Sequence, residues 1–200
     1  MVAIMREMVD SARNQIEPIH QESDNDDGNV QDDGHNYNLY NWNGHFHPVP
    51  LRFKFPIGIN SDQLWNLYFH GDNSIAPKLP PYKILKDIDM SKTDLSYFCK
   101  ARFVVNIIAL MAYISVLFEI TGKNRHDLAS TLSTKDINIA ISNLSFSESK
   151  LIYNKGVQDL LLIVHPNSQR SSSIVYTTLY KRIKNYDKAS LTKLGSFISK

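Results

Sequence analysis

The sequence predicts a mainly α-helical domain built around one long central helix, with a short β-hairpin before it. A capping pattern at residues 91–94 starts an apolar run that extends to Ile120, which predicts the central helix. Several shorter amphipathic segments follow this run and predict further helices. Ahead of it, residues 37–58 are rich in aromatic side chains and contain three prolines. This composition excludes a helix and favours extended chain.

The first 36 residues differ from the rest of the chain in charge. Residues 1–20 carry an apolar stripe that predicts a short amphipathic helix, and charged side chains interrupt it where a secretory signal needs an apolar run. Residues 21–36 hold six acidic side chains and one aliphatic one, so we expect a disordered acidic linker. Two basic and nine acidic side chains give residues 1–36 a net charge of −7. The predicted helical domain, residues 37–200, has 20 basic and 11 acidic side chains and a net charge of +9.

A two-residue Asn-Gly turn predicts that residues 38–42 and 45–49 form the hairpin. Two prolines follow the turn and cannot donate to a strand ladder, so we expect a short sheet at an edge. His45 and His47 lie two residues apart, so on a strand they share a face and could chelate a metal ion. The alternative is a packed, hydrogen-bonded pair, because the third ligand would have to come from the acidic linker.

Residues 60–71 predict a second, short helix. Asn60 can cap its first turn, Gln63 stands three residues later, and Gly71 fits the C-terminal stop. Leu64, Leu67 and Tyr68 form an apolar stripe that Trp65 and Phe69 widen, so the helix must pack on other parts of the domain. We place three rings in the core: Trp42, Phe53 and Trp65.

The predicted central helix covers about residues 92–120 and stops at Gly122. Its segment from residue 103 to 120 is apolar over 18 residues, the short limit for crossing a bilayer about 30 Å thick. Two interpretations stay open for this segment, a core helix and a membrane anchor. Cys99 continues the apolar pattern upstream, where we expect its thiol to be buried as a small hydrophobic group.

Four helices are expected after the central one. Three of them cover about residues 124–132, 135–144 and 148–164, the second of them after Ser133 and Thr134. Serines 171–173 can cap the fourth, an amphipathic helix over about residues 173–186. Three cations lie toward its end: Lys181, Arg182 and Lys184. Such cations either complement the helix dipole or contact phosphates.

Several chemistries lack their sequence signature. A single cysteine excludes an internal disulfide framework and a cysteine-rich zinc site. The eight glycines never cluster into a phosphate-binding loop, and the sequence has no Gly-x-Ser-x-Gly elbow for a nucleophile. The arginine and histidine set of a tyrosine recombinase is not recognisable either. We therefore expect a protein without catalytic activity and without a cofactor.

Residues 37–112 also resemble a known group of proteins. The pattern is Trp42-x-Gly44-x-x-His47-Pro48-Val49-Pro50-x-x-Phe53-x-Phe55-Pro56, then Leu64-Trp65-x-Leu67-x-x-x-Gly71 and Pro81-Tyr82-x-Ile84-Leu85. It is similar to a segment of uncharacterised, lineage-expanded protist proteins, some of them derived from mobile elements. The resemblance implies that hairpin, short helix, proline-rich connector and long helix form one module. It implies no activity and no catalytic residue.

The charge pattern favours nucleic acid as the partner. Cations interleave with aromatic side chains, and such surfaces neutralise phosphates and stack on bases. We expect the contacts from eight residues: Arg52, Lys54, Lys78, Lys83, Lys86, Lys181, Arg182 and Lys184. The predicted function is thus a non-catalytic, nucleic-acid-associated protein inside the cell, with the nucleus as one location. Two alternatives are a helical module that binds another protein and a membrane-anchored protein that uses residues 103–120.

Overall fold

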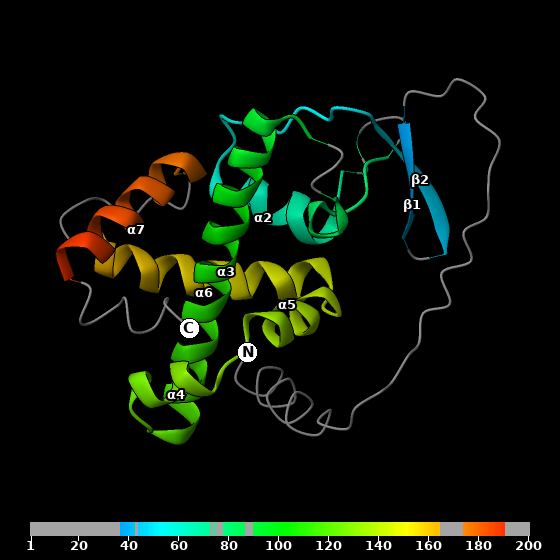
Figure 1. The fold of residues 1–200 in the computed structure, drawn as a ribbon. Coiled ribbons are helices and arrows are strands. Elements are labelled where there is room, and N and C mark those ends of the chain that lie inside the picture. The colour runs from blue at the N-terminus through cyan, green and yellow to red at the C-terminus, as the bar shows by residue number, and fades with distance from the viewer. Residues whose placement is uncertain are drawn as a thin grey trace.

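The structure is a computed structural model that describes residues 37–42, 44–72, 74, 78–86, 90–164 and 174–190. The helix predicted at residues 1–20 and the linker predicted at residues 21–36 lie outside the described residues. The elements are β1 (Tyr37–Trp42), β2 (His45–Pro50), α2 (Ser61–His70), the 3₁₀ turn η1 (Tyr82–Ile84), α3 (Lys92–Thr121), α4 (Arg125–Thr131), α5 (Thr134–Ser142), α6 (Phe146–Val164) and α7 (Tyr176–Ser190). Figure 1 shows the other helices around α3, with the hairpin to one side. This confirms the predicted fold class.

The ends of α3 follow from its sequence. The Ser91 side-chain oxygen accepts a hydrogen bond from the Asp94 backbone N–H at 3.2 Å, which satisfies a free donor of the first turn. At the other end, Gly122 adopts a left-handed φ of 64°, and its N–H bonds to the Phe118 carbonyl. The predicted limits of the central helix are confirmed to within one residue.

Helix α3 is the core helix of the domain. Every residue from Val104 to Leu117 is buried except Asn106, which accepts a hydrogen bond from the Asn138 amide of α5 at 2.9 Å. By length and composition α3 could cross a membrane, yet 72% of its most apolar 18-residue window is buried inside the structure. The other helices therefore cover the apolar sides that a membrane span would present to lipid.

Helix α6 crosses α3 in close contact (Figure 1). The crossing point is Gly156, where an added Cβ would collide with the backbone carbonyl of Ile108 on α3. A side chain at this position would force the two helices apart, so the glycine is required by the packing of the backbones. This glycine was not singled out in the sequence, because glycine in a helix only signals lower helix propensity.

Helices α5 and α6 begin at side-chain caps. Helix α5 begins at Thr134, one residue before its predicted start, and the Ser133 side chain accepts from the Asp136 N–H. Helix α6 begins at residue 146 rather than 148. Ser145 and Glu148 form a reciprocal capping box there, with the Ser145 N–H bonded to the Glu148 carboxylate at 2.9 Å. The Ser-x-x-Glu spacing was the missed signal.

The C-terminal helix α7 begins at Tyr176, after an extended segment. Val175 forms an isolated antiparallel bridge with Asn60, and the Ile174 carbonyl accepts from the Ser61 N–H at 2.8 Å. Our prediction that the helix already includes residue 174 is wrong, because this bridge holds the chain extended. The predicted cap at residues 171–173 lies outside the described residues.

The two strands form an antiparallel hairpin with Trp42 opposite His45 near the turn and Tyr37 opposite Pro50 at the base. Gly44 in the turn has a φ of 77°, which glycine adopts without strain. The described sheet has two strands, in agreement with the short sheet that the prolines predict.

One face of the hairpin packs on the helical body. Tyr40 and Val49 on this inner face are buried, and the Tyr40 hydroxyl accepts a hydrogen bond from the Lys86 backbone N–H at 3.1 Å. Trp42 is only half-buried and lies against the His47 ring, with 5.3 Å between ring centroids. Its predicted core position is wrong, because it lies near the turn, beyond the body of the domain.

The other two predicted core rings are confirmed. Trp65 has no exposed surface, and Phe53 is 9% exposed. Cys99, in contrast, is exposed, with its sulfur 3.9 Å from an Arg102 guanidinium nitrogen. The expectation of a buried thiol is therefore wrong. Phe98 takes the inward position at this turn, and the next residue of a helix points about 100° away.

Candidate nucleic-acid interface

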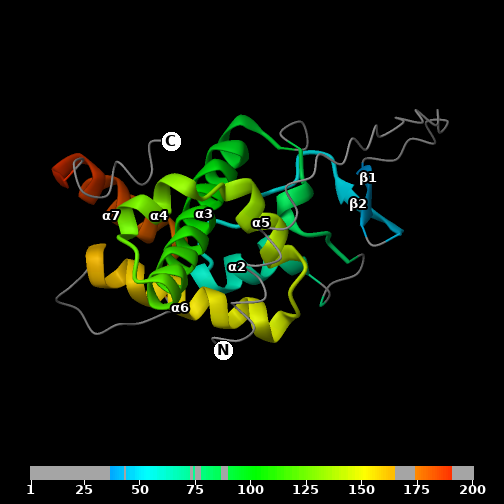
Figure 2. The same cartoon turned by 90° about the horizontal axis from the view of Figure 1, so that it is seen from below.

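The eight predicted contact residues fall into two groups. The hairpin-end cations follow β2 or lie around η1: Arg52, Lys54, Lys78, Lys83 and Lys86. The α7 cations are Lys181, Arg182 and Lys184. Helix α7 and the hairpin lie at opposite ends of the molecule in two perpendicular views (Figures 1 and 2). The sequence-predicted residues therefore form two separate regions.

Acidic side chains neutralise few of these cations. Between described residues, the ion pairs join Lys150 to Asp62 at 3.6 Å, and Lys155 to Glu119 at 2.8 Å and to Asp159 at 3.7 Å. Seven of the predicted contact residues form no ion pair with another described residue: Arg52, Lys54, Lys78, Lys83, Lys181, Arg182 and Lys184. No acidic side chain of the described residues neutralises their positive charge.

The α7 cations lie in the middle of their helix. Because α7 extends to Ser190, the stretch from 181 to 184 is not its last turn. A helix dipole acts on charges within the last turn, so dipole compensation does not account for this cluster. The prediction that these cations lie at the helix end is wrong.

Aromatic rings of α3 support the cations at the α7 end. The Lys184 ammonium lies 4.5 Å from the centre of the Phe103 ring, and the Tyr180 ring meets Phe103 edge-on at 5.5 Å. On the neighbouring turn, the Lys100 ammonium lies 4.5 Å from the centre of the Tyr97 ring. These cation–π contacts fix where the charges lie. Each ammonium also occupies one face of its ring.

The hairpin end has an open apolar face instead. Side chains alternate across a strand, so Tyr37, Leu39 and Asn41 of β1 share one face with Phe46, Pro48 and Pro50 of β2, hereafter the outer face. Leu39 is 52% exposed and Phe46 is 69% exposed, the highest value among the large hydrophobic side chains of the described residues. Isolated exposed apolar residues are common, but an apolar strip on a sheet face indicates a contact surface.

Arg52 and Lys54 follow this face directly and are exposed. Arg52 holds a positive φ of 58°, a left-handed conformation that non-glycine residues seldom adopt. Strained backbone of this kind is found more often at binding sites than elsewhere. The chain thus presents two cations beside the apolar strip, one of them from an unfavourable backbone conformation.

Lys83 is less exposed than its predicted role as a contact residue requires. Its side chain is half-buried, with the ammonium 5.9 Å from the centre of the Phe69 ring, and burial lowers its pKa. Lys83 also acts on His70: burial lowers the pKa of His70 first, and the positive charge of Lys83 lowers it further. The predicted contact residues are therefore unequal, and Arg52 and Lys54 are the ones beside the outer face.

The possible metal ligands His45 and His47 have no third ligand near them among the described residues. The register places His45 and His47 on the inner face, as expected from their spacing. His45 is exposed, while His47 packs against Trp42. No group of three His, Cys, Asp or Glu side chains within the described ranges could hold a metal ion. Of the two histidines, His47 packs against an aromatic ring as the packed alternative expects, whereas His45 does not.

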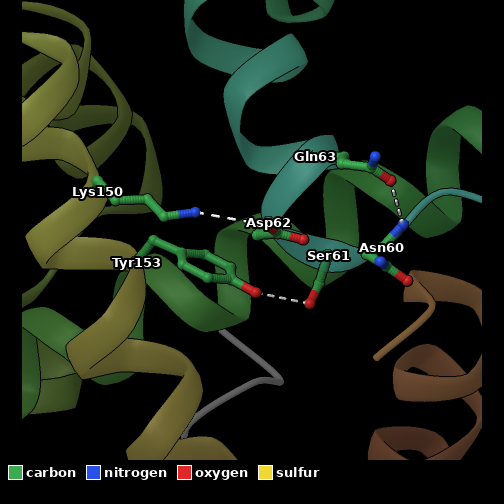
Figure 3. Close-up of polar contacts among 6 residues, drawn as sticks. All are labelled: Asn60, Ser61, Asp62, Gln63, Lys150 and Tyr153. Carbon is green, nitrogen blue, oxygen red and sulfur yellow. Dashed lines mark hydrogen bonds and ion pairs between the residues drawn. The ribbon is translucent and has the colours of Figure 1, made fainter. Parts of the chain in front are cut away.

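A polar seam between α2 and α6 was missed in the sequence. The Ser61 and Tyr153 hydroxyls lie 2.8 Å apart, beside the ion pair of Lys150 with Asp62, as Figure 3 shows. One turn further along α2, the Trp65 indole N–H donates to the Ser149 hydroxyl at 2.9 Å. The signal was the spacing of Ser149 and Tyr153, four residues apart on one helix face.

This polar seam resembles a reactive site in composition but not in environment. Ser61, Ser149 and Tyr153 are buried, and burial raises the pKa of the Tyr153 phenol. A neutral, enclosed phenol is a poor base, and the seam exposes no hydroxyl to a substrate. Its hydrogen bonds instead fix how α2 packs on α6, since buried polar groups must find partners.

Comparisons with family models, with curated proteins and with solved structures found no match to this chain. The resemblance to lineage-expanded protist proteins therefore stays a prediction.

Proposed function

We propose that this protein associates with nucleic acid without catalysing a reaction. The observation behind the proposal is unneutralised positive charge: residues 37–200 have a net charge of +9, and seven predicted contact residues form no ion pair with another described residue. A protein that neutralises phosphates releases bound counterions, and this release favours binding. Of the α7 cations, Lys184 is already positioned by its contact with the Phe103 ring, which favours phosphate contact at this end.

The test is a binding titration of the full chain at several salt concentrations. Replacing the α7 cations by glutamine should weaken binding to all sequences alike, because phosphate contacts carry no sequence information. If each cation contacts one phosphate of a duplex, the slope of log affinity against log salt should become shallower by about 2 to 3.

A matched control removes the same charge elsewhere. Lys92, Lys123 and Lys135 are exposed cations of other segments, and their triple glutamine variant changes the net charge equally. The α7 variant should weaken binding far more than this control. Equal effects would mean that binding is diffuse, and the absence of salt-dependent binding at micromolar concentration would overturn the proposal.

The acidic residues 1–36 provide a second test. Their net charge of −7 opposes the approach of a polyanion to the basic body. Deleting them should raise the affinity, most clearly at low salt, where the screening length is about 30 Å at 0.01 M. The gain should shrink as salt is added, and an unchanged affinity would exclude such competition.

A further inference from the structure

We propose that the outer face of the hairpin binds single-stranded nucleic acid, with a base stacked on Phe46 and the phosphates contacted by Arg52 and Lys54. This inference rests on the proposed function and names the ligand of one of its two regions. It starts from an apolar face that no other described part of the domain covers.

The hairpin is held firmly enough to present this face. Val49 on the inner face has no exposed surface, and the Tyr40 hydroxyl bonds to the backbone N–H of Lys86. Because strand residues alternate, anchoring the inner face turns Leu39 and Phe46 outward. Their exposure is thus imposed by the packing of the opposite face.

The dimensions of the face suit an extended ligand. Phe46 lies near the turn of the hairpin, and Arg52 lies six positions further along the chain, in the turn that follows β2. Across the four strand steps from Phe46 to Pro50, at roughly 3.3 Å per residue, the apolar strip is about 13 Å long. Leu39 and Pro48, a cross-strand pair, fill the interval with apolar surface.

An exposed ring beside cations favours a single strand over a duplex. Bases inside a duplex stack on one another and hide their faces, whereas unpaired bases stack on aromatic side chains. At the α7 end, the Phe103 ring is already covered by Lys184 and Tyr180. Base stacking is therefore assigned to the hairpin end, and the α7 end is left with phosphate contacts.

The positive charge beside the outer face argues against two other ligands, a second copy of this chain and a segment of another protein. A second copy packed through the same face would leave Arg52 and Lys54 unpaired, because the outer face itself carries no acidic side chain. A protein segment would match the apolar strip but would leave both cations unpaired unless it were acidic. A nucleic-acid strand supplies flat apolar bases and regularly spaced phosphates in one molecule.

The experiment measures binding of the full chain to a labelled oligothymidine and to a duplex of equal length. Phe46→Ala should weaken single-strand binding by about 5-fold to 150-fold, the range for loss of one stacked base, and should leave duplex binding almost unchanged. Phe46→Trp should restore binding, because a larger ring still stacks. Phe146→Ala is the matched control, since Phe146 is also exposed, at 55%, but lies on α6.

The outcomes separate this inference from the proposed function. If Phe46→Ala binds like the wild type while the α7 glutamine variant still loses affinity and salt dependence, the inference fails and the proposed function stands. If no variant shows salt-dependent binding, both fail. If Phe46→Ala instead reduces self-association in sedimentation equilibrium, the face belongs to a second copy and the inference is overturned.

Discussion

The two ends of this molecule both carry clustered cations, but the packing beneath the cations differs. At the α7 end, Tyr176, Leu179 and Ile183 are fully buried beneath the cations. At the hairpin end, the cations adjoin a two-stranded sheet whose inner face is buried only through Tyr40 and Val49. Substitutions of these buried side chains should therefore lower stability, whereas substitutions of the exposed cations above them should change it little. On the outer face of the hairpin, the large apolar side chains are themselves exposed, so they too can be replaced with little effect on stability.

The two tryptophans give the largest expected contrast between core and hairpin. Trp65→Ala removes a fully buried ring and its hydrogen bond to Ser149, so we expect a loss of about 3 to 5 kcal/mol in the free energy of unfolding. Trp42→Ala, on the hairpin, should cost about 1 kcal/mol or less. Each variant retains one tryptophan as the fluorescence reporter for denaturant unfolding. Equal losses would show that the ring on the hairpin contributes as much to stability as the ring on α2.

A second pair compares the two ends directly. Ile183→Ala beneath the α7 cations should lower the free energy of unfolding by about 2 to 5 kcal/mol, because Ile183 has no exposed surface. Leu39→Ala on the outer face should change it by less than about 0.5 kcal/mol. Thermal and urea unfolding would measure both. A large loss for Leu39→Ala would mean that its side chain is covered in solution.

The hairpin end should also respond to pH. Burial lowers the pKa of His70, so below its ordinary pKa of 6.5 the unfolded chain binds more protons at this residue than the folded one. Stability should be full above pH 6.5 and fall as the pH decreases toward the lowered folded pKa. Urea unfolding across this window, repeated on His70→Gln, should show a flatter pH dependence for the variant. An identical profile would assign the acid sensitivity to other groups.

The smallest expected effect is on the stability of Phe46→Ala. With 69% of Phe46 exposed, its removal should shift the free energy of unfolding by less than about 0.5 kcal/mol. The unfolding midpoint is therefore the fold control for the binding experiment. A substantial loss would mean that the ring packs against the protein and is not free to stack.

Local rules predicted the elements well. Caps and stops such as Ser91, Gly122 and Ser133 depend on neighbours within one helical turn, so the sequence contains them in full. The start of α7 was misplaced because Val175 pairs with Asn60, far away in the chain. Trp42 was misjudged for a related reason: its aromatic character predicts burial, but its position near the turn leaves it at the rim.

The division of the candidate interface into two ends could not be predicted. The sequence places Arg52 just after a strand and Lys184 on a helix. Local patterns do not say on which sides of the domain these two elements lie. Their separation depends on how α6 and α7 pack on α3. The same holds for the rings beneath the cations, since Phe103 and Lys184 meet only in the folded chain.

The contact of α7 with the start of α2 has a consequence for the order of folding. The Tyr176 hydroxyl donates to the Pro56 carbonyl, 120 positions earlier, whereas the crossing of α3 and α6 joins Ile108 to Gly156. The longer loop costs only about 0.8 kcal/mol more to close by the logarithmic law. During synthesis, however, the Ser61 N–H at the start of α2 cannot find its partner until Ile174 has left the ribosome. The first turn of α2 is therefore completed only after α3 and α6, against which the helix also packs, have been synthesised.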